Sequence, residues 1–215
     1  MGKIVCLMGK SCAGKDTIYK RLLADSEMDL TKIVPYTTRP IREGEREGVE
    51  YFYTDENGFQ RMKGQGKVIE DRAYHTYHGL WRYFTVDDDQ MRDTSRSYLM
   101  IGTLEAYRKL QEYFGVDRLL PVMVELEDGI RLQRALSREL AQENPKYGEM
   151  CRRFLADSED FSEEKIAEAG IVRRFVNDDL ERCLGEIKDY IKDGISAAGE
   201  RISGEERLEE GLLPV

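Results

Sequence analysis

The sequence predicts an α/β fold in which a parallel sheet is covered by helices on both faces. Short apolar runs alternate with segments of helical periodicity along most of the chain, and strands separated by helices pair in parallel. The chain has 215 residues, which suits one domain with insertions, and its 40% hydrophobic content can supply a core.

The first elements form a strand, a loop and a helix. Residues 3–8 are an apolar run, the expected first strand, and a glycine-rich stretch follows. Residues 15–25 are expected to be helical because Ile18, Leu22 and Leu23 recur on one face. Ile33 and Val34 are expected to form a short strand that Pro35 ends.

The composition then changes. Residues 36–48 are polar, charged and punctuated by glycine, and residues 50–85 bring short aromatic runs with a helix expected near 55–63. We interpret residues 36–90 as an inserted subdomain of mixed strands and turns.

The alternation resumes after the insertion. Thr103 is the expected N-cap of a helix, and Pro145 separates two later helices. The expected strands are 97–101, 119–126 and 171–176, and the expected helices follow Thr103 and cover 128–141, 147–158 and 178–192. From Gly194 onward the chain is polar, and we expect a frayed or loosely docked tail.

Composition also limits the function. The formal net charge of −9 argues against general binding to nucleic acid or to a membrane surface. No segment is apolar enough to be a signal peptide or to span a bilayer. The four cysteines lack metal-site spacing and are expected to be reduced thiols in a cytoplasmic protein.

The loop after the first strand has the spacing of a phosphate-binding loop. Gly9-x-x-x-x-Gly14-Lys15 stands between a buried-type strand and a helix, where backbone N–H groups can surround a phosphate and Lys15 can reach it. A glycine-rich turn without a ligand is the alternative, which the strand–loop–helix context disfavours. The expected ATP site comprises Gly9, Lys10, Ser11, Cys12, Ala13, Gly14, Lys15, Asp16 and Thr17.

Asp16 occupies the position at which a Ser or Thr hydroxyl usually binds Mg²⁺. A carboxylate is also a good oxygen ligand for Mg²⁺. An acidic residue is equally favoured at a helix start by capping and by the helix dipole. The residues leave a magnesium ligand and a helix-start residue as open alternatives.

Two groups of arginines suit phosphoryl transfer. Arg39 and Arg42, beside Thr37 and Thr38, can grip a phosphate monoester, although a solvated turn is the alternative. Further along, Arg131, Arg134 and Arg138 share a helix face by spacing, and Arg152 and Arg153 follow Pro145 and Gly148, where a lid could close. Surface pairing with nearby glutamates is the alternative there.

Over residues 3–192 these motifs resemble guanylate kinase. The resemblance is carried by GKSCAGKD, TTRPIREGEREGVEY, GKVIE, RALSR and FVNDDLERCLGEIKDYI. It implies a five-stranded parallel P-loop core (1–35, 91–127 and 159–193), a nucleoside-monophosphate subdomain (36–90), a lid (128–158) and a flexible tail (194–215).

The resemblance also implies function. The reaction would be Mg²⁺-dependent transfer from ATP to GMP or dGMP, by a monomer or homodimer. Lys15, Arg134, Arg138 and Arg153 would be catalytic, and Asn177 would lie near the adenine of ATP. The acceptor would contact Thr38, Arg39, Arg42, Tyr51, Glu70 and either Tyr77 or Tyr83.

Four positions depart from the family pattern: Asp16, Pro35, Leu80 and Met100 replace polar family residues. A guanine pocket needs several polar partners, although Glu70 alone can still distinguish guanine from adenine because a carboxylate favours two N–H donors. A kinase for another phosphorylated acceptor therefore stays open. A non-catalytic binding module is disfavoured because Lys15, Arg134 and Arg138 are retained.

Overall fold

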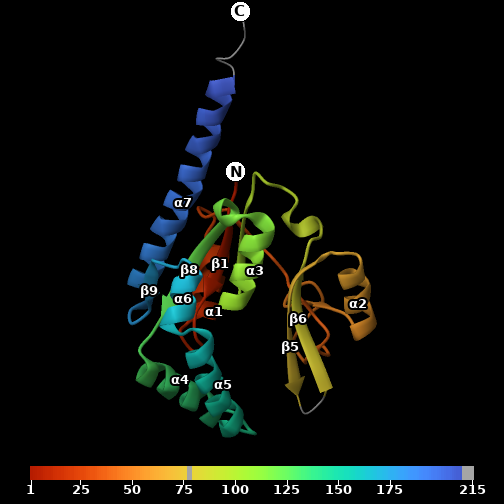
Figure 1. Ribbon diagram of the computed structural model, residues 1–215. Helices are drawn as coiled ribbons and strands as arrows, with labels where there is room; N and C mark the ends of the chain where they lie inside the picture. Colours follow the sequence, from red (N-terminus) through yellow and green to blue (C-terminus); the bar gives the residue numbers. More distant parts are fainter. Residues whose placement is uncertain (77–78, 210–215) are drawn as a thin grey trace, which may run out of the picture.

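The computed structural model describes residues 1–76 and 79–209, with side chains described for residues 1–75 and 79–197. A five-stranded sheet forms the centre of the molecule (Figure 1). Its strands all pair in parallel, in the order β2 (Leu30–Lys32), β7 (Ser97–Ile101), β1 (Ile4–Met8), β8 (Leu119–Glu125) and β9 (Arg174–Val176). The predicted fold class is confirmed.

Helices cover both faces of this sheet. Val5 and Leu7 of β1 pack with α1 (Lys15–Ala24) and α7 (Leu180–Glu209), whereas Ile4, Cys6 and Met8 pack with α3 (Leu104–Phe114) and α6 (Glu163–Glu168). All five residues of β1 are buried, which explains its uninterrupted apolar sequence. The carboxyl end of β1 is thus held firmly where the glycine-rich loop begins.

The insertion forms a second sheet in the order β4 (Phe52–Tyr53), β3 (Tyr36–Thr37), β6 (Gly79–Val86) and β5 (Val68–Thr76). Phe59 of α2 (Glu56–Gly64) packs with Phe84 and Val86 of β6. Figure 1 shows α2 on the side of the β5–β6 hairpin that faces away from the central sheet. The opposite face of the hairpin is therefore available to build a site.

Two helices, α4 (Asp128–Leu140) and α5 (Tyr147–Asp160), follow β8 and pack against each other. A short 3₁₀ turn at Asp89–Met91 precedes β7, and another at Val116–Arg118 precedes β8. Thr103 caps α3 as predicted, its hydroxyl accepting a hydrogen bond from the Ala106 N–H at 3.2 Å. No helix in the described part of the chain is long and apolar enough to cross a membrane.

The predicted strand at Ile33 and Val34 is wrong: both residues are buried between β2 and β3. The side chain of Gln90 takes the place of a neighbouring strand at Val34. It accepts from the Val34 N–H at 2.8 Å and donates to the Val34 carbonyl at 3.1 Å. The last strand is shorter than predicted, and α6 was not predicted.

The last helix is longer than predicted, and the flexible tail expected over residues 194–215 stays a prediction. The helix α7 continues to Glu209, whereas residues 210–215 lie outside the described residues. A Cβ at Gly194 would lie 2.9 Å from the Leu120 side chain, and Ile195 packs against the core. Gly194 thus allows α7 to pack closely against Leu120, at the position where the sequence suggested that the helix had ended.

Candidate functional site

The glycine-rich loop adopts the backbone geometry that a phosphate cradle needs. Gly9 has φ 143° and Gly14 has φ 98°, and Cys12 is also left-handed at φ 63°. A Cβ at Gly9 would lie 2.2 Å from the Val124 carbonyl oxygen, so only glycine fits there. Gly14 is the N-cap of α1 and makes no side-chain capping hydrogen bond. The free N–H groups at the start of the helix are therefore not occupied by an N-cap side chain.

Lys15 lies inside this loop. Its ammonium group donates a hydrogen bond to the Lys10 carbonyl oxygen at 2.9 Å. Burial lowers the pKa of Lys15, while the nearby carboxylates of Asp16 and Asp157 act in the opposite direction. A desolvated cation is thus held where the predicted phosphate groups would lie.

Asn177, the residue after β9, contacts the backbone of the glycine-rich loop. Its side-chain amide donates to the Ala13 carbonyl oxygen at 2.7 Å, and the residue is buried. A Cβ at Gly14 would lie 2.1 Å from the Asn177 amide nitrogen and 3.8 Å from an Arg134 guanidinium nitrogen. Asn177, predicted to lie near the adenine of ATP, and Arg134, predicted to be catalytic, therefore meet at Gly14.

The other predicted lid arginines reach the same loop from two helices. Arg138 of α4 and Arg153 of α5 line a recess of about 20 Å³ together with Ser11 and Cys12 of the loop. Glu149 accepts hydrogen bonds from Arg152 at 2.7 Å and from Arg153 at 2.9 Å. These bonds lower the pKa of Glu149 to about 2, Arg152 contributing most.

Arg138 and Arg131 line the same recess, in keeping with their spacing on the helix, but Arg131 is the more deeply buried. Its side chain is 1% exposed, whereas Arg134 and Arg138 are exposed. The helix α4 buries the row of Arg131, Ala135 and Glu139 and exposes a row of leucines at Leu132, Leu136 and Leu140. Arg131 and Glu139 lie inward because polar partners there satisfy their charged groups.

Those partners include a residue that the sequence did not reveal, Asp157 of α5. Its Oδ2 accepts from the Ser11 backbone N–H at 2.7 Å and from Arg131 Nη2 at 3.0 Å. Arg131 also donates to the Ser11 carbonyl at 2.9 Å and to Asp128, and stacks over Phe154 at 5.0 Å. The pair thus joins both lid helices to the phosphate loop. Arg131 and Asp157 are far apart in sequence, so no local spacing indicated the contact.

Asp16 lies exposed on the first turn of α1, and Thr17 follows it. The N-cap is Gly14, so Asp16 makes no capping hydrogen bond, although its position still suits the helix dipole. Within the described chain, no three His, Cys, Asp or Glu side chains gather as a metal site. The assignment of Asp16 to Mg²⁺ stays a prediction.

The predicted acceptor-phosphate residues gather around Arg39. Its guanidinium, 3% exposed, forms two hydrogen bonds of 2.8 Å with the Glu45 carboxylate and lies 5.3 Å from the Tyr51 ring centre. The Arg39 hydrogen bond lowers the pKa of Glu45 to about 2. Arg39 Nε is a buried side-chain nitrogen without a hydrogen-bond partner among the described residues. An unpaired buried donor of this kind fits an anion.

The other residues predicted for the acceptor phosphate have partners of different kinds. The Tyr83 ring lies 5.6 Å from that of Tyr51, which brings Tyr83 close to this site. Tyr77 lies outside the described residues, so the choice between Tyr77 and Tyr83 stays a prediction. Thr38 uses its hydroxyl to accept from the Arg82 N–H at 2.9 Å. Arg42 is exposed, and its backbone N–H donates to Glu45 at 2.8 Å.

Glu70 is 2% exposed on β5. Its Oε1 accepts from the Thr85 hydroxyl at 2.8 Å, and its Oε2 accepts from Arg72 Nε at 3.2 Å. Burial, and then the nearby Glu70 carboxylate, raises the pKa of Cys6 on β1 to about 12. Sequence reasoning found Glu70 but missed both partners.

Three of the positions that depart from the family pattern supply no polar side chain beside Glu70. Leu80 is exposed at the start of β6, Met100 is buried in the core beside β1, and Pro35 is half-buried.

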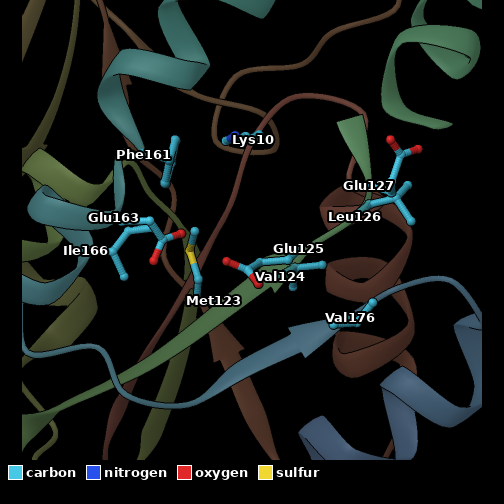
Figure 2. A pocket seen from close by; sticks show the side chains of 10 residues that line it. All are labelled: Lys10, Met123, Val124, Glu125, Leu126, Glu127, Phe161, Glu163, Ile166 and Val176. Atoms are coloured by element: carbon cyan, nitrogen blue, oxygen red, sulfur yellow. The ribbon is translucent and has the colours of Figure 1, made fainter. Parts of the chain in front are cut away.

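A separate cavity of about 260 Å³ lies between the end of β8 and α6. Figure 2 shows Phe161, Ile166 and Met123 beside the carboxylates of Glu125 and Glu163. Among the predicted site residues that the structure describes, Lys10 alone is in the lining of this cavity. The cavity is therefore distinct from the rest of the predicted site.

Comparison with known proteins agrees with this geometry. The family model described as guanylate kinase matches residues 1–91. The chain is 30% identical over 190 residues to a guanylate kinase of Parasynechococcus marenigrum, covering 86% of this chain and 94% of that protein. It is 29% identical over 192 residues to one of Caldanaerobacter subterraneus, covering 88% and 86%.

The fold agrees as well. A crystal structure of guanylate kinase from Anaplasma phagocytophilum superposes with a TM-score of 0.58 at 21% identity, covering 90% of this chain and 86% of that one. With the phosphate loop, the lid arginines and the Arg39 cluster in place, and with relatives matched over most of their length, the chain belongs to the guanylate kinase family.

Proposed function

We propose that the protein transfers a phosphoryl group from ATP to a nucleoside monophosphate, GMP or dGMP. The observation that carries this proposal is the recess in which Arg138 and Arg153 meet Ser11 and Cys12 of the phosphate loop. Phosphoryl transfer needs a phosphate cradle, an aligned acceptor and positive charge around the transferring group. The chain has residues suited to each requirement.

On the donor side, the backbone of residues 9–17 would hold the β- and γ-phosphates, with Lys15 bound to their oxygens. Asn177 supports the loop through Ala13, and Arg134 beside Gly14 lies where the donor nucleotide would extend. The exposed Asp16 carboxylate and Thr17 hydroxyl are oxygen donors of the kind that Mg²⁺ prefers, so these residues fit the metal. Bound there, Mg²⁺ would neutralise charge on the donor phosphates.

On the acceptor side, Arg39, Arg42, Tyr51 and Tyr83 would hold the phosphate of the monophosphate. Glu45 keeps the Arg39 guanidinium in place, and the unpaired Arg39 Nε is left for an anion. An oxygen of the acceptor phosphate is itself the nucleophile, so the protein needs none. Arg138 and Arg153 would stabilise the charge that develops between the two phosphates, and closure of α5 would exclude water.

The base would be recognised at Glu70. A buried carboxylate accepts hydrogen bonds and therefore favours guanine, which offers two adjacent N–H groups, over adenine. A second candidate function, a kinase for a different acceptor, is favoured by the apolar side chains of Leu80 and Met100 in place of polar family residues.

A coupled assay with Mg-ATP and each of GMP, dGMP, AMP, UMP and CMP tests the proposal. We expect ADP release with GMP and dGMP, and none from the Lys15→Ala variant. ADP release with another monophosphate alone would support the second candidate. No release with any of them, from protein that binds Mg-ATP, would contradict the proposal.

We propose a cytoplasmic location for this activity. All four cysteines are free thiols, two of them buried, which is consistent with a reducing compartment. The partners would be small nucleotides, and the protein would act as a monomer or a homodimer.

A further inference from the structure

The strand β5 places an unexpected cation next to the base-reading carboxylate. Side chains alternate along a strand, so Glu70 and Arg72 lie on the same face. Their partners across the hairpin are Thr85, opposite Glu70, and Tyr83, opposite Arg72. This is the face turned away from α2, and it also carries the tyrosines that adjoin Arg39.

Arg72 is held by one of its nitrogens. Its Nε donates to Glu70 Oε2 at 3.2 Å, and its side chain is 19% exposed. Neither Nη group has a hydrogen-bond partner among the described residues. Because the Nε bond fixes one edge of the guanidinium, its Nη donors have a defined direction beside the carboxylate.

We propose that Arg72 is a second base-reading residue, which donates a hydrogen bond to the 6-oxo group of guanine. This inference rests on the proposed function. The Watson–Crick edge of guanine presents one acceptor, O6, followed by two donors, N1–H and the 2-amino group. Arg72 and Glu70 side by side present a donor followed by acceptors, which is the complementary order.

The same arrangement explains how the site can read guanine without polar groups at Leu80 and Met100. Adenine would bring its amino group towards the Arg72 donors and its unprotonated N1 towards the Glu70 carboxylate. Both contacts would leave buried polar groups unpaired, which strongly disfavours the wrong base.

A purely structural role for Arg72, neutralising Glu70, makes a different prediction. Loss of such a role would weaken every nucleotide alike, whereas loss of a base contact weakens only ligands with a good acceptor at position 6. The pair GMP and 6-thio-GMP separates the two, because sulfur is a poor hydrogen-bond acceptor and the rest of the base is unchanged.

The test is equilibrium binding of GMP and 6-thio-GMP to wild type, Arg72→Met, Arg72→Lys and a matched control, Arg82→Met. Arg82 is an ion-paired arginine of similar exposure, 17%, on the same hairpin, but it pairs with Glu56 and lies over Phe59 of α2. We expect wild type and Arg82→Met to prefer GMP by about tenfold, the effect of one hydrogen bond to a charged group. Arg72→Met should bind both equally, and Arg72→Lys should recover part of the preference.

An unchanged preference for GMP in Arg72→Met would overturn the inference, as would an equal loss of affinity for both nucleotides. If wild type binds GMP with the expected preference but forms no GDP with Mg-ATP, the proposed function fails while the base-reading role stands. If wild type binds neither nucleotide, both fail.

Discussion

Removing the Asp157 carboxylate should destabilise the protein, because it leaves a charge buried at the phosphate loop. In Asp157→Ala, Arg131 stays 1% exposed but loses its 3.0 Å contact, and the Ser11 N–H loses its 2.7 Å acceptor. Breaking a buried ion pair from one side costs about 3–5 kcal/mol. Arg131 keeps Asp128, which is exposed, and the Ser11 carbonyl, so we expect a smaller cost than this, about 2–3 kcal/mol.

Urea unfolding and calorimetry measure this loss. For a chain of this size the expected fall in Tm is roughly 5–10 °C. Replacing both partners, Arg131→Met with Asp157→Ala, should recover most of the stability because no unpaired charge remains. Arg152→Ala removes an exposed ion pair with Glu149 and serves as the control, with an expected cost below about 1 kcal/mol. A loss below about 0.5 kcal/mol in Asp157→Ala would refute the reasoning.

Three further predictions concern the site. Lys15→Ala should reduce turnover by at least about 100-fold, because the donor phosphates lose the buried cation that would bind them. The circular dichroism spectrum should be unchanged. Near-normal turnover would exclude the loop as the donor site. Asp16→Ser should shift the Mg²⁺ concentration for half-maximal rate, and an unchanged value would exclude Asp16 as a ligand. The folded pKa of Glu45, about 2, lies below its ordinary 4.5, so its stabilisation exists above pH 4.5 and is lost as pH falls towards 2. Urea midpoints at pH 5 and pH 3 should therefore differ less in Glu45→Gln than in wild type; equal differences would contradict this role for Arg39 and Glu45.

Elements whose burial is uniform could be predicted from the sequence. The first strand is apolar throughout because helices cover both of its faces, and the helix after Thr103 starts where its hydroxyl caps it. Ile33 and Val34 misled the prediction because two apolar residues indicate burial but not pairing. On α4 the buried row contains Arg131, whose partners on α5 and in the phosphate loop could not be foreseen from the sequence.

The site divides in the same way. Lys15 and Arg39 stand in local motifs whose spacing carries their chemistry, and the structure gives each the surroundings expected of it. Asp157 and Thr85 have partners that come from another helix or from the neighbouring strand, so local spacing could not indicate them. Arg72 stands two residues from Glu70 on the same strand, and its contact is one that strand alternation alone could have suggested.

The measurement that tests the central claim most directly is product analysis of wild-type protein with Mg-ATP and GMP. The account predicts GDP and ADP in equal amounts, with neither formed by Lys15→Ala. ADP without GDP would mean that ATP is hydrolysed and that the Arg39 cluster does not hold the acceptor. Neither product, in protein that binds both nucleotides, would contradict phosphoryl transfer at this site.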